Sequence, residues 1–324
     1  MNTKHFVLEV LEKNRDKSIS GEYIGNCLNL SRNMIWRAIK DLRKEGYMIE
    51  AITNKGYRLA AENDIISAEG IKPFLISSDL ANNIKVYNVI DSTNKEAKLQ
   101  AINQAPHGTV IISNEQTHGQ GRFGREFFSP SNSGLYMSVL LRPQNMNLIN
   151  PTTITAYTAL CVCEVLENLC NLNPSIKWVN DIFLDGKKIS GILTEAMTDY
   201  ESNSISIIVL GIGINICTKI EDFPKEIQSI AGSLYPDGDV AITRNSLAAE
   251  IINRILFTDT PPESFIFEQY KKRLFMLGRR ITVIQGHEKY SAKALDINSH
   301  GHLIIQMPNG EIREILSGEI QIDN

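Results

Sequence analysis

The chain has 324 residues, which is too long for one ordinary hydrophobic core and predicts two or three domains. Apolar residues make up 43% and charged residues 22%, a balance that excludes a disordered protein and indicates a soluble globular one. The longest apolar stretch, near residues 205–216, is broken by glycines and too short to span a membrane, and the N-terminus lacks the apolar core of a signal peptide. Because the five cysteines show no framework spacing, we expect a cytoplasmic protein without membrane contact.

The net charge of −4 is divided unevenly along the chain. Residues 1–60 hold 11 Lys and Arg against 7 Asp and Glu, a net charge of +4, whereas the other 264 residues hold 22 against 30, a net charge of −8. A basic head on an acidic body predicts that only the head approaches nucleic acid.

The N-terminal segment predicts three helices. Apolar residues recur at helical spacing over residues 6–11. Ser20 and Ser31 are typical N-caps, the first for a short helix that ends near Leu28 and the second for a longer helix that ends near Glu45. The third helix has an apolar face formed by Ile35, Ile39 and Leu42.

Two strand-like segments follow, Met48–Ile52 and Gly56–Leu59, joined by a short turn. A β-hairpin with basic residues after a helix-turn-helix is typical of a winged helix, in which the third helix enters the major groove and the wing meets the DNA backbone or minor groove. Such units also serve as protein-interaction modules, and Trp36 fits either the core or DNA readout. We predict a DNA-binding domain over residues 1–62, with DNA contacts from Ser31, Arg32, Asn33, Trp36, Arg37, Lys40, Lys55 and Arg58.

Strand-like and helix-like segments alternate over residues 66–274, which predicts a second domain with a mixed sheet and helices packed on it. The predicted strands are Val86–Val89, Thr109–Ser113, Leu135–Leu141, Ser175–Trp178, Ile182–Leu184, Ile192–Met197 and Ile205–Ile214. The predicted helices are Asn94–Gln104, Thr152–Leu172, Arg244–Leu256 and Pro262–Leu274. Four polar motifs lie at the ends of these strands, where sites tend to form in such sheets.

The first motif, Asp91-Ser92-Thr93-Asn94, leads from a strand into a helix. The amides at a helix start, together with the Ser92 and Thr93 hydroxyls, are suited to holding a small polar group. Taken alone, the motif is equally an ordinary N-cap.

The second motif is Glu115-Gln116-Thr117-His118-Gly119-Gln120-Gly121-Arg122-Phe123-Gly124-Arg125. Its glycines spell the dinucleotide-binding pattern, but turn-like residues rather than a helix follow them, and no Walker lysine is present. We therefore expect a flexible loop whose amides, with Arg122 and Arg125, wrap an anion and become ordered on binding. A surface linker is the alternative.

The third motif runs Lys177-Trp178-Val179-Asn180-Asp181-Ile182 and continues as Asp185-Gly186-Lys187-Lys188-Ile189-Ser190-Gly191-Ile192-Leu193-Thr194-Glu195. A strand, a polar turn and a second strand would bring a carboxylate, an amide and an ammonium together. Asp181 is thus a candidate Mg²⁺ ligand, and Lys188 a candidate partner for a phosphate oxygen. The simpler interpretation of residues 186–188 is an exposed hairpin turn.

The fourth motif, Leu210-Gly211-Ile212-Gly213-Ile214-Asn215, places alternate glycines on an apolar strand. Such glycines let a ligand lie directly against the backbone, and Asn215 at the strand end is able to hydrogen-bond to it. Close packing of a helix on the strand explains the glycines equally well, but not Asn215.

The C-terminal segment, residues 275–324, predicts a small β-barrel of the SH3-like kind. No single residue in it stands out as functional, and a structural cap is one interpretation of the domain. The predicted strands are Gly278–Ile284, Lys289–Ile297, His302–Gln306 and Ile312–Leu316.

In their order and spacing these motifs resemble those of the biotin protein ligase family. The resemblance covers essentially the whole chain, including the winged helix of the bifunctional members. It implies a winged helix-turn-helix, a central α/β ligase domain like that of class II synthetases, and an SH3-like barrel that closes over ATP or receives the carrier protein. Two positions depart from the family pattern: Gln120 replaces the first arginine of the loop, and Val179 replaces a proline.

The resemblance implies that ATP activates the carboxylate of biotin, giving biotinyl-5′-AMP and pyrophosphate, before the acyl group passes to a lysine of a biotin carboxyl carrier protein domain. Such chemistry needs charge neutralisation and positioning rather than a covalent nucleophile. The implied catalytic residues are Lys188, Arg122 and Asp181, of which Asp181 would also hold Mg²⁺. The implied biotin-binding residues are Ser92, Thr93, Asn94, Gln116, Gln120, Gly121, Arg122 and Lys188. The implied ATP-binding residues are Arg122, Arg125, Asn180, Asp181 and Asn215.

The resemblance also implies a homodimer that forms when the adenylate is bound and that represses transcription from a palindromic operator of the biotin operon. Biotinyl-AMP would then be both the reaction intermediate and the corepressor. Two alternatives stay open. A biotin-sensing transcription factor without catalysis is favoured only by Gln120, and a lipoate ligase is disfavoured by the winged helix and the C-terminal barrel.

Overall fold

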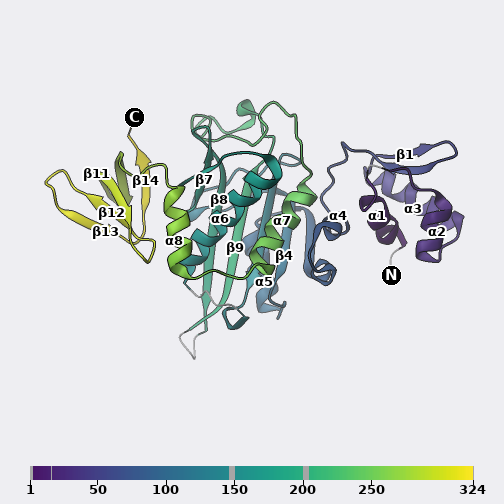
Figure 1. Ribbon diagram of the computed structural model, residues 1–324, viewed down its shortest axis with the longest axis horizontal. Coiled ribbons are helices and arrows are strands. Elements are labelled where there is room, and N and C mark those ends of the chain that lie inside the picture. The colour runs from purple at the N-terminus through teal and green to yellow at the C-terminus, as the bar shows by residue number, and fades with distance from the viewer. Residues whose placement is uncertain (1–2, 16, 146–149, 200–203, 324) are drawn as a thin grey trace. The chain divides into compact units, whose positions relative to one another are not determined.

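The computed structural model describes residues 3–15, 17–145, 150–199 and 204–323. The chain forms two compact units (Figure 1), of which the first comprises Met1–Val86 with Ile242–Asn253 and the second Tyr87–Ala241 with Arg254–Asn324. The three predicted domains divide the chain differently, and their boundaries stay a prediction.

The first unit begins with the predicted helix-turn-helix and wing. The elements are α1 (Thr3–Glu12), α2 (Gly21–Leu28), α3 (Arg32–Lys44), β1 (Ile49–Ile52) and β2 (Gly56–Leu59). The predicted caps are present, because the Ser20 Oγ accepts from the Tyr23 amide at 3.0 Å and the Ser31 Oγ accepts from the Met34 amide at 3.4 Å. Both helices therefore start where short-range hydrogen bonding alone places them.

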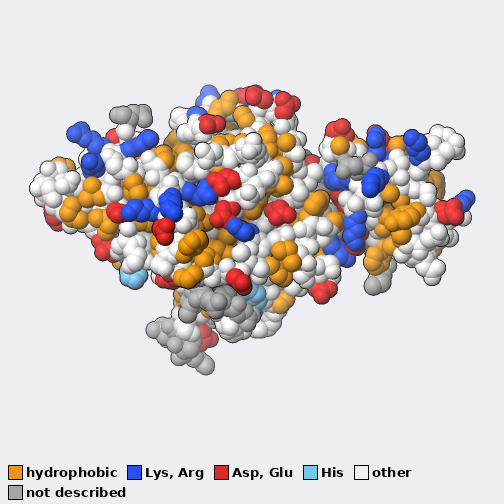
Figure 2. All heavy atoms as spheres, in the orientation of Figure 1, with side chains coloured by type: hydrophobic (Ala, Val, Ile, Leu, Met, Phe, Trp, Pro, Cys, Tyr) orange, Lys and Arg blue, Asp and Glu red, His pale blue; other side chains and the backbone are white. Residues whose placement is uncertain are grey.

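The helix α3 has one buried face and one exposed face. Ile35, Ile39 and Leu42 are at most 1% exposed and belong to the core that α1, α2 and the wing share. Trp36 is 54% exposed, so it is not a core residue. All eight side chains predicted to contact DNA are exposed, and Figure 2 shows Lys and Arg side chains spread over the visible surface of this unit.

The extension of the first unit beyond the winged helix was not predicted from the sequence. It contains α4 (Ala68–Ile71) and two short 3₁₀ turns, η1 (Lys72–Phe74) and η2 (Ser78–Asn83), together with the start of α7 (Arg244–Phe257). Arg244, only 4% exposed, donates to Asp64 from its backbone amide at 2.7 Å and from its side-chain Nε at 2.8 Å. Such bonds between segments about 180 residues apart leave no local signal in the sequence.

The second unit is built on a seven-stranded sheet with the order β3-β4-β5-β9-β8-β7-β6. All seven predicted strands are present, and the five neighbouring pairs from β4 to β6 are antiparallel. The strands are β3 (Ile84–Ile90), β4 (Thr109–Gln116), β5 (Gly134–Leu141), β6 (Ser175–Lys177), β7 (Asp181–Leu184), β8 (Lys187–Thr198) and β9 (Ile205–Asn215).

The strand β8 starts earlier than predicted. Asp185 and Gly186, with φ of 49° and 77°, form the whole turn between β7 and β8, and Leu184 pairs directly with Lys187. Two residues with positive φ suit a tight hairpin. Lys187 and Lys188 thus belong to a strand, and the simpler interpretation of residues 186–188 as an exposed turn holds only for Gly186.

Helices pack against this sheet at the predicted positions (Figure 1): α5 (Thr93–Ile102) on β4, β5 and β9, α6 (Pro151–Cys170) on β8, and α8 (Glu263–Lys272) on α6. Every residue of β5 at the centre of the sheet is buried, the polar Ser138 included. Among the described residues, every helix is too short or too polar to pass through a lipid bilayer.

The C-terminal part of the second unit is an antiparallel sheet with the order β13-β12-β11-β10-β14. The strands are β10 (Arg280–Gln285), β11 (Glu288–Ile297), β12 (Leu303–Gln306), β13 (Ile312–Ile315) and β14 (Glu319–Ile322). The first four match the predicted strands. The strand β14 was not predicted, because its four residues offer too short an alternation to distinguish it from a tail.

Candidate active site

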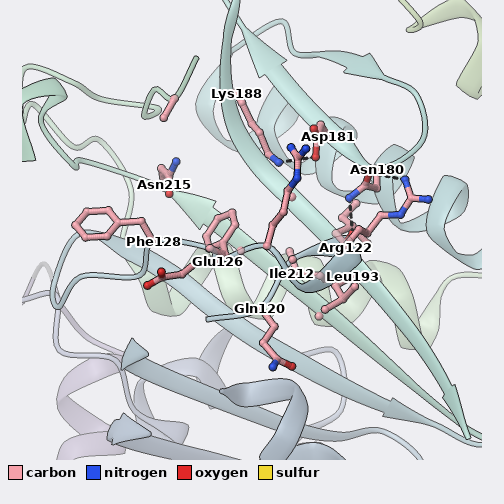
Figure 3. A pocket seen from close by; sticks show the side chains of 18 of the residues that line it. Gln120, Arg122, Glu126, Phe128, Asn180, Asp181, Lys188, Leu193, Ile212 and Asn215 are labelled. Carbon is pink, nitrogen blue, oxygen red and sulfur yellow. Dashed lines mark hydrogen bonds and ion pairs between the residues drawn. The ribbon is translucent and has the colours of Figure 1, made fainter. Parts of the chain in front are cut away.

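One pocket gathers all four sequence motifs (Figure 3). Its walls come from the start of α5, the loop after β4, the hairpin of β7 and β8, and β9. All twelve residues predicted to hold biotin or ATP, or to act in catalysis, line it: Ser92, Thr93, Asn94, Gln116, Gln120, Gly121, Arg122, Arg125, Asn180, Asp181, Lys188 and Asn215.

A charged cluster lies on three adjacent strands of this pocket. The Lys188 Nζ is 2.6 Å from the Asp181 Oδ1, and the Lys177 Nζ is 3.6 Å from the Asp181 Oδ2. Strand pairing explains the cluster, since Lys177 is directly opposite Asp181 and Phe183 is directly opposite Lys188. The two ammonium groups exceed the one carboxylate, so the cluster is suited to an anionic ligand.

Arg122 extends the cationic side of the pocket. Its Nη1 donates to the Asn180 Oδ1 and to the Gly318 carbonyl, both at 3.3 Å, and Figure 3 shows it beside Asn180. Burial lowers the pKa of the Arg122 guanidinium from its ordinary value, while the Asp181 carboxylate raises it. A partly desolvated guanidinium of this kind interacts strongly with a phosphate or carboxylate.

The glycine-rich loop is closed by its own backbone. The Phe127 amide donates to the Gly119 carbonyl at 2.9 Å, and the Gly121 amide donates to the Arg125 carbonyl at 2.7 Å. A Cβ at Gly119 would lie 2.3 Å from the Phe127 carbonyl oxygen, so the closure requires glycine there. The loop is therefore not a loose surface linker. Gln120 is exposed, and in Figure 3 its amide points away from Lys188 and Asp181.

The start of α5 is held by side chains of the sheet and the loop. The Thr93 amide and Oγ1 both donate to the Gln116 Oε1, at 2.8 and 3.1 Å. The Asn94 Nδ2 donates to the Glu195 Oε2 at 2.8 Å. Ser92 occupies the N-cap position, but its side chain makes no capping hydrogen bond. The motif therefore does not act as an ordinary N-cap.

The two glycines of β9 are explained by close packing. A Cβ at Gly211 would lie 2.3 Å from the Asn94 Oδ1, and one at Gly213 would lie 2.5 Å from the Phe127 ring. Protein side chains thus fill the space over both glycines. At Gly211 the side chain belongs to α5, which agrees with the expectation that a helix packs closely on this strand.

Asn215 presents a free acceptor in the pocket. It is 5% exposed and its Nδ2 donates to the Gly232 carbonyl at 2.9 Å, which fixes the orientation of the amide. The Oδ1 has no hydrogen-bond partner among the described residues. A buried acceptor without a partner costs stability unless a ligand supplies a donor.

Sequence reasoning missed several residues that line this pocket, among them Lys177 and Glu319. Lys177 stands in a recognised motif but was assigned no role. Glu319, on the unpredicted strand β14, lines the pocket, and its Oε1 accepts from the Arg125 Nη1 at 2.6 Å. No sequence signal identified Glu319, because it follows the glycine-rich loop by almost two hundred residues.

Comparison with known proteins matches three segments of the chain to family models. Residues 3–58 match an HTH domain, residues 86–215 match the biotin/lipoate A/B protein ligase family, and residues 276–323 match the biotin protein ligase C-terminal domain.

Two curated relatives match almost the entire chain, and both are named bifunctional ligase/repressor BirA. The protein from Bacillus spizizenii is 32% identical and that from Bacillus subtilis 31% identical, each over 98% of this chain and 97% of the relative. Among solved structures, a biotin protein ligase from Aquifex aeolicus in complex with biotin and ATP matches with a TM-score of 0.62 and 28% identity, over 74% of this chain and 98% of that one.

Proposed function

Because this chain belongs to the family of bifunctional ligase/repressor proteins, we propose that it is both a biotin protein ligase and a biotin-responsive transcriptional repressor. The ligase joins biotin to ATP, releasing pyrophosphate and forming biotinyl-5′-AMP. It then transfers the biotinyl group to a lysine of a biotin carboxyl carrier protein domain, releasing AMP. The observation that carries the ligase proposal is the gathering of all four motifs around the Lys188–Asp181 pair in one pocket.

In the first step an oxygen of the biotin carboxylate attacks the α-phosphorus of ATP, and the bond to pyrophosphate breaks. Both reactants are anionic, so the main barrier is charge repulsion. The Lys188 ammonium and the Arg122 guanidinium line the same pocket and neutralise that charge. The Asp181 carboxylate, 2.6 Å from the Lys188 Nζ, holds the ammonium in place. No group on the protein needs to form a covalent bond.

In the second step the neutral amine of the carrier lysine attacks the acyl carbonyl of biotinyl-5′-AMP. AMP leaves as the amide bond forms, and one proton is lost from the amine. The same two cations stabilise the charge that develops on the carbonyl oxygen and on the departing phosphate.

The nucleotide is held by the polar end of the pocket. The free Oδ1 of Asn215 accepts a hydrogen bond from the nucleotide, and Arg125 and Asn180 flank the phosphates. Mg²⁺ is bound by one or two carboxylates and completed by phosphate oxygens in many ATP sites. Asp181 would hold Mg²⁺, which would supply further neutralisation of the phosphate charge, although the described residues offer no group of three metal-binding side chains.

Repression rests on the winged helix-turn-helix. Eight exposed side chains on α3 and the wing form the DNA-contacting surface. A dimer that forms on adenylate binding presents two such surfaces to the half-sites of a palindromic operator. We place the protein in the cytoplasm, where ATP, operator DNA and carrier domains are all available and the thiols of Cys161 and Cys163 stay reduced.

The experiment that tests the ligase proposal mixes the protein with biotin, ATP, Mg²⁺ and a carrier domain free of biotin. Mass spectrometry of the carrier domain is expected to show one added biotinyl group. An unmodified carrier with biotin still bound to the protein would favour a non-catalytic biotin sensor, and modification by lipoate in competition with biotin would favour a lipoate ligase.

A further inference from the structure

A chain of hydrogen bonds connects the pocket to a carboxylate that lies outside it. Thr93 and Asn94 line the pocket at the start of α5, whereas Ser138 on β5 and Glu195 on β8 do not. The Ser138 Oγ is 2.7 Å from the Thr93 Oγ1 and 2.5 Å from the Asn94 Oδ1. The Asn94 Nδ2 donates to the Glu195 Oε2 at 2.8 Å. Thr93, Asn94 and Ser138 are at most 4% exposed, so water does not compete for these hydrogen bonds.

Glu195 fixes the direction of the bonds in this chain. A carboxylate only accepts hydrogen bonds, so the Asn94 atom that faces it is the NH₂ group, and the Asn94 Oδ1 faces Ser138. An amide oxygen also only accepts, and a hydroxyl has one proton, so the Ser138 proton goes to Asn94. The Ser138 oxygen is then left to accept. The other oxygen of the carboxylate accepts from the Lys98 Nζ at 3.0 Å.

The Thr93 hydroxyl consequently presents lone pairs to the pocket. Its one proton has two protein acceptors, the Gln116 Oε1 at 3.1 Å and the Ser138 Oγ at 2.7 Å. The Gln116 amide is held in its orientation, because its Nε2 donates to the Ser129 Oγ at 2.9 Å. A ligand at Thr93 must therefore bring a donor. The negative charge at the far end of the chain polarises its bonds and makes the Thr93 oxygen a better acceptor.

This acceptor and the cations lie at different levels of the pocket. Gly191 on β8 is directly opposite Gly213 on β9, and a Cβ at Gly191 would lie 3.5 Å from the Lys188 Nζ. A Cβ at Gly211 would instead lie 2.3 Å from the Asn94 Oδ1. Gly211 and Gly213 are two residues apart on one strand, which is about 7 Å. A ligand with its carboxylate at Lys188 thus reaches the start of α5 with its other end.

We propose that Glu195 is a positioning residue, which makes the Thr93 hydroxyl an acceptor for an N–H group of the ligand. It acts through Asn94 and Ser138. The inference rests on the proposed ligase function, since biotin carries its carboxylate on an alkyl chain and two N–H donors on the urea of its ring. Lipoate carries its carboxylate on a similar chain, but its dithiolane ring has no N–H. Glu195 therefore favours a ring of the urea class over a dithiolane.

Two simpler roles for Glu195 predict different outcomes. If it only anchored α5 to β8, its loss would lower stability and weaken every ligand alike. If it only added a negative charge near the pocket, its loss would tighten the binding of biotin, which is an anion. The relay predicts weaker binding, and only for ligands that bring the N–H group.

The test measures the Kd of biotin for the full chain by isothermal titration calorimetry without ATP. Glu195→Gln keeps the shape of the side chain and removes its charge. Glutamine donates as well as accepts, so Asn94 is no longer held in one orientation. We expect the Kd to rise about three- to tenfold, the effect of weakening one hydrogen bond. The rate of pyrophosphate release at saturating biotin should stay near that of the wild type, because the reacting groups are untouched.

Matched ligands show whether the N–H group is involved. Two isomeric analogues of biotin each have one urea N–H replaced by a ring oxygen. For the isomer that lacks the N–H at Thr93, Glu195→Gln is expected to cause no further loss of affinity. For the other isomer, the loss should equal that for biotin.

Two further variants test the path. Ser138→Ala interrupts the same chain and is expected to raise the Kd of biotin by a similar factor, with no further rise when it is combined with Glu195→Gln. Lys98→Met removes the ion pair but leaves the Glu195 charge, so the Kd should stay within about twofold of the wild-type value. All titrations are made well below the thermal midpoints of the variants, so that every protein is folded.

Wild-type or tighter binding of biotin by Glu195→Gln would overturn this inference. So would an equal loss for biotin and for both isomers, because Glu195 would then be only an anchor. Additive losses in the Glu195→Gln and Ser138→Ala pair would also count against the relay. A wild-type protein that does not bind biotin would overturn the ligase proposal instead.

Discussion

The Lys188 ammonium and the Asp181 carboxylate, 2.6 Å apart, are brought together by the hairpin of β7 and β8. The two-residue turn at Asp185 and Gly186 sets the pairing as far as Phe183 and Lys188, and an irregularity between Phe183 and Ile182 then shifts the register before Asp181. Because both residues lie on paired strands joined by a short turn, the ion pair with the Asp181 carboxylate holds the Lys188 ammonium at one place in the pocket. A preorganised cation needs no rearrangement when negative charge develops in the transition state.

Replacing Lys188 by alanine is expected to slow biotinyl-AMP formation by about 10²–10³-fold, which is the usual loss for a group that acts on developing charge. Pyrophosphate release in a single turnover measures the step. Lys187→Ala is the matched control, because its Nζ donates to the Gln228 and Ser229 carbonyls and does not line the pocket. Near-normal pyrophosphate release by Lys188→Ala would exclude the assigned role.

Asp181→Asn keeps the shape of the side chain and removes its charge. Loss of a charged hydrogen-bonding group costs about 1.5–3 kcal/mol, so we expect kcat/KM for ATP to fall about 10–100-fold. If Asp181 shares Mg²⁺ with ATP, the Mg²⁺ concentration for half-maximal rate also rises. Asp185→Asn in the exposed turn is the control, since asparagine accepts the positive φ of 49° found there. An unaltered Mg²⁺ dependence in Asp181→Asn would refute the metal assignment.

Gln120→Arg is expected to retain biotinyl-AMP longer. The residue is exposed, so the added cation contributes only about 0.5–1 kcal/mol, and the dissociation rate of the adenylate falls about two- to fivefold. Stopped-flow fluorescence after mixing with excess unlabelled ligand measures that rate. In the proposed mechanism repression requires bound adenylate, so operator occupancy should improve with it. Gln120→Ala, which adds no charge, serves as the reference, and equal dissociation rates for the two variants would contradict the prediction.

Trp36→Ala separates DNA readout from folding. Because Trp36 is 54% exposed, the variant should fold normally and biotinylate the carrier at the wild-type rate. Its affinity for duplexes that the wild-type protein selects in the presence of biotin and ATP should fall about tenfold, since one good base contact is worth about 1–3 kcal/mol. Ile39→Ala, at a position 1% exposed, is instead expected to lose about 2–5 kcal/mol of stability. Wild-type affinity in Trp36→Ala would place Trp36 outside the DNA interface.

The buried thiols of α6 should resist alkylation. Burial raises the pKa of the Cys161 thiol to about 12 from an ordinary 9.0. At pH 8 the thiolate fraction therefore falls from about a tenth to roughly 10⁻⁴, and only the thiolate reacts with iodoacetamide. We expect the exposed Cys27 to be labelled in the native protein, and Cys161 only after unfolding. Peptide mass spectrometry distinguishes them, and rapid native labelling of Cys161 would count against its burial.

The sequence predictions were most accurate for features that depend on interactions between residues close together in the chain. Ser20 and Ser31 start their helices through hydrogen bonds that reach only three residues along the chain, so a single-sequence pattern suffices to find them. The apolar face of α3 follows from helical periodicity for the same reason. The four polar motifs were also visible, because each occupies a continuous stretch at the end of a strand.

What the motifs do together was decided by tertiary structure. The opposition of Phe183 and Lys188, which brings the ammonium to Asp181, depends on the register of a hairpin whose turn was not located correctly from the sequence. The glycines of β9 were ambiguous until Asn94 and Phe127 were seen to fill the space over them. Glu319 joins the pocket only because β14 pairs with β10, a contact between segments with no shared local pattern.

The sequence by itself therefore determined the chemistry available to this protein, namely the cations, carboxylate and amides of a ligase and the basic helix of a DNA-binding domain. The tertiary structure decided which of these groups meet. It set the 2.6 Å approach of Lys188 to Asp181 and brought Glu319 to the Arg125 guanidinium. The physical reason is that helix caps and periodicity act over a few residues, whereas strand register and packing join groups far apart in the chain.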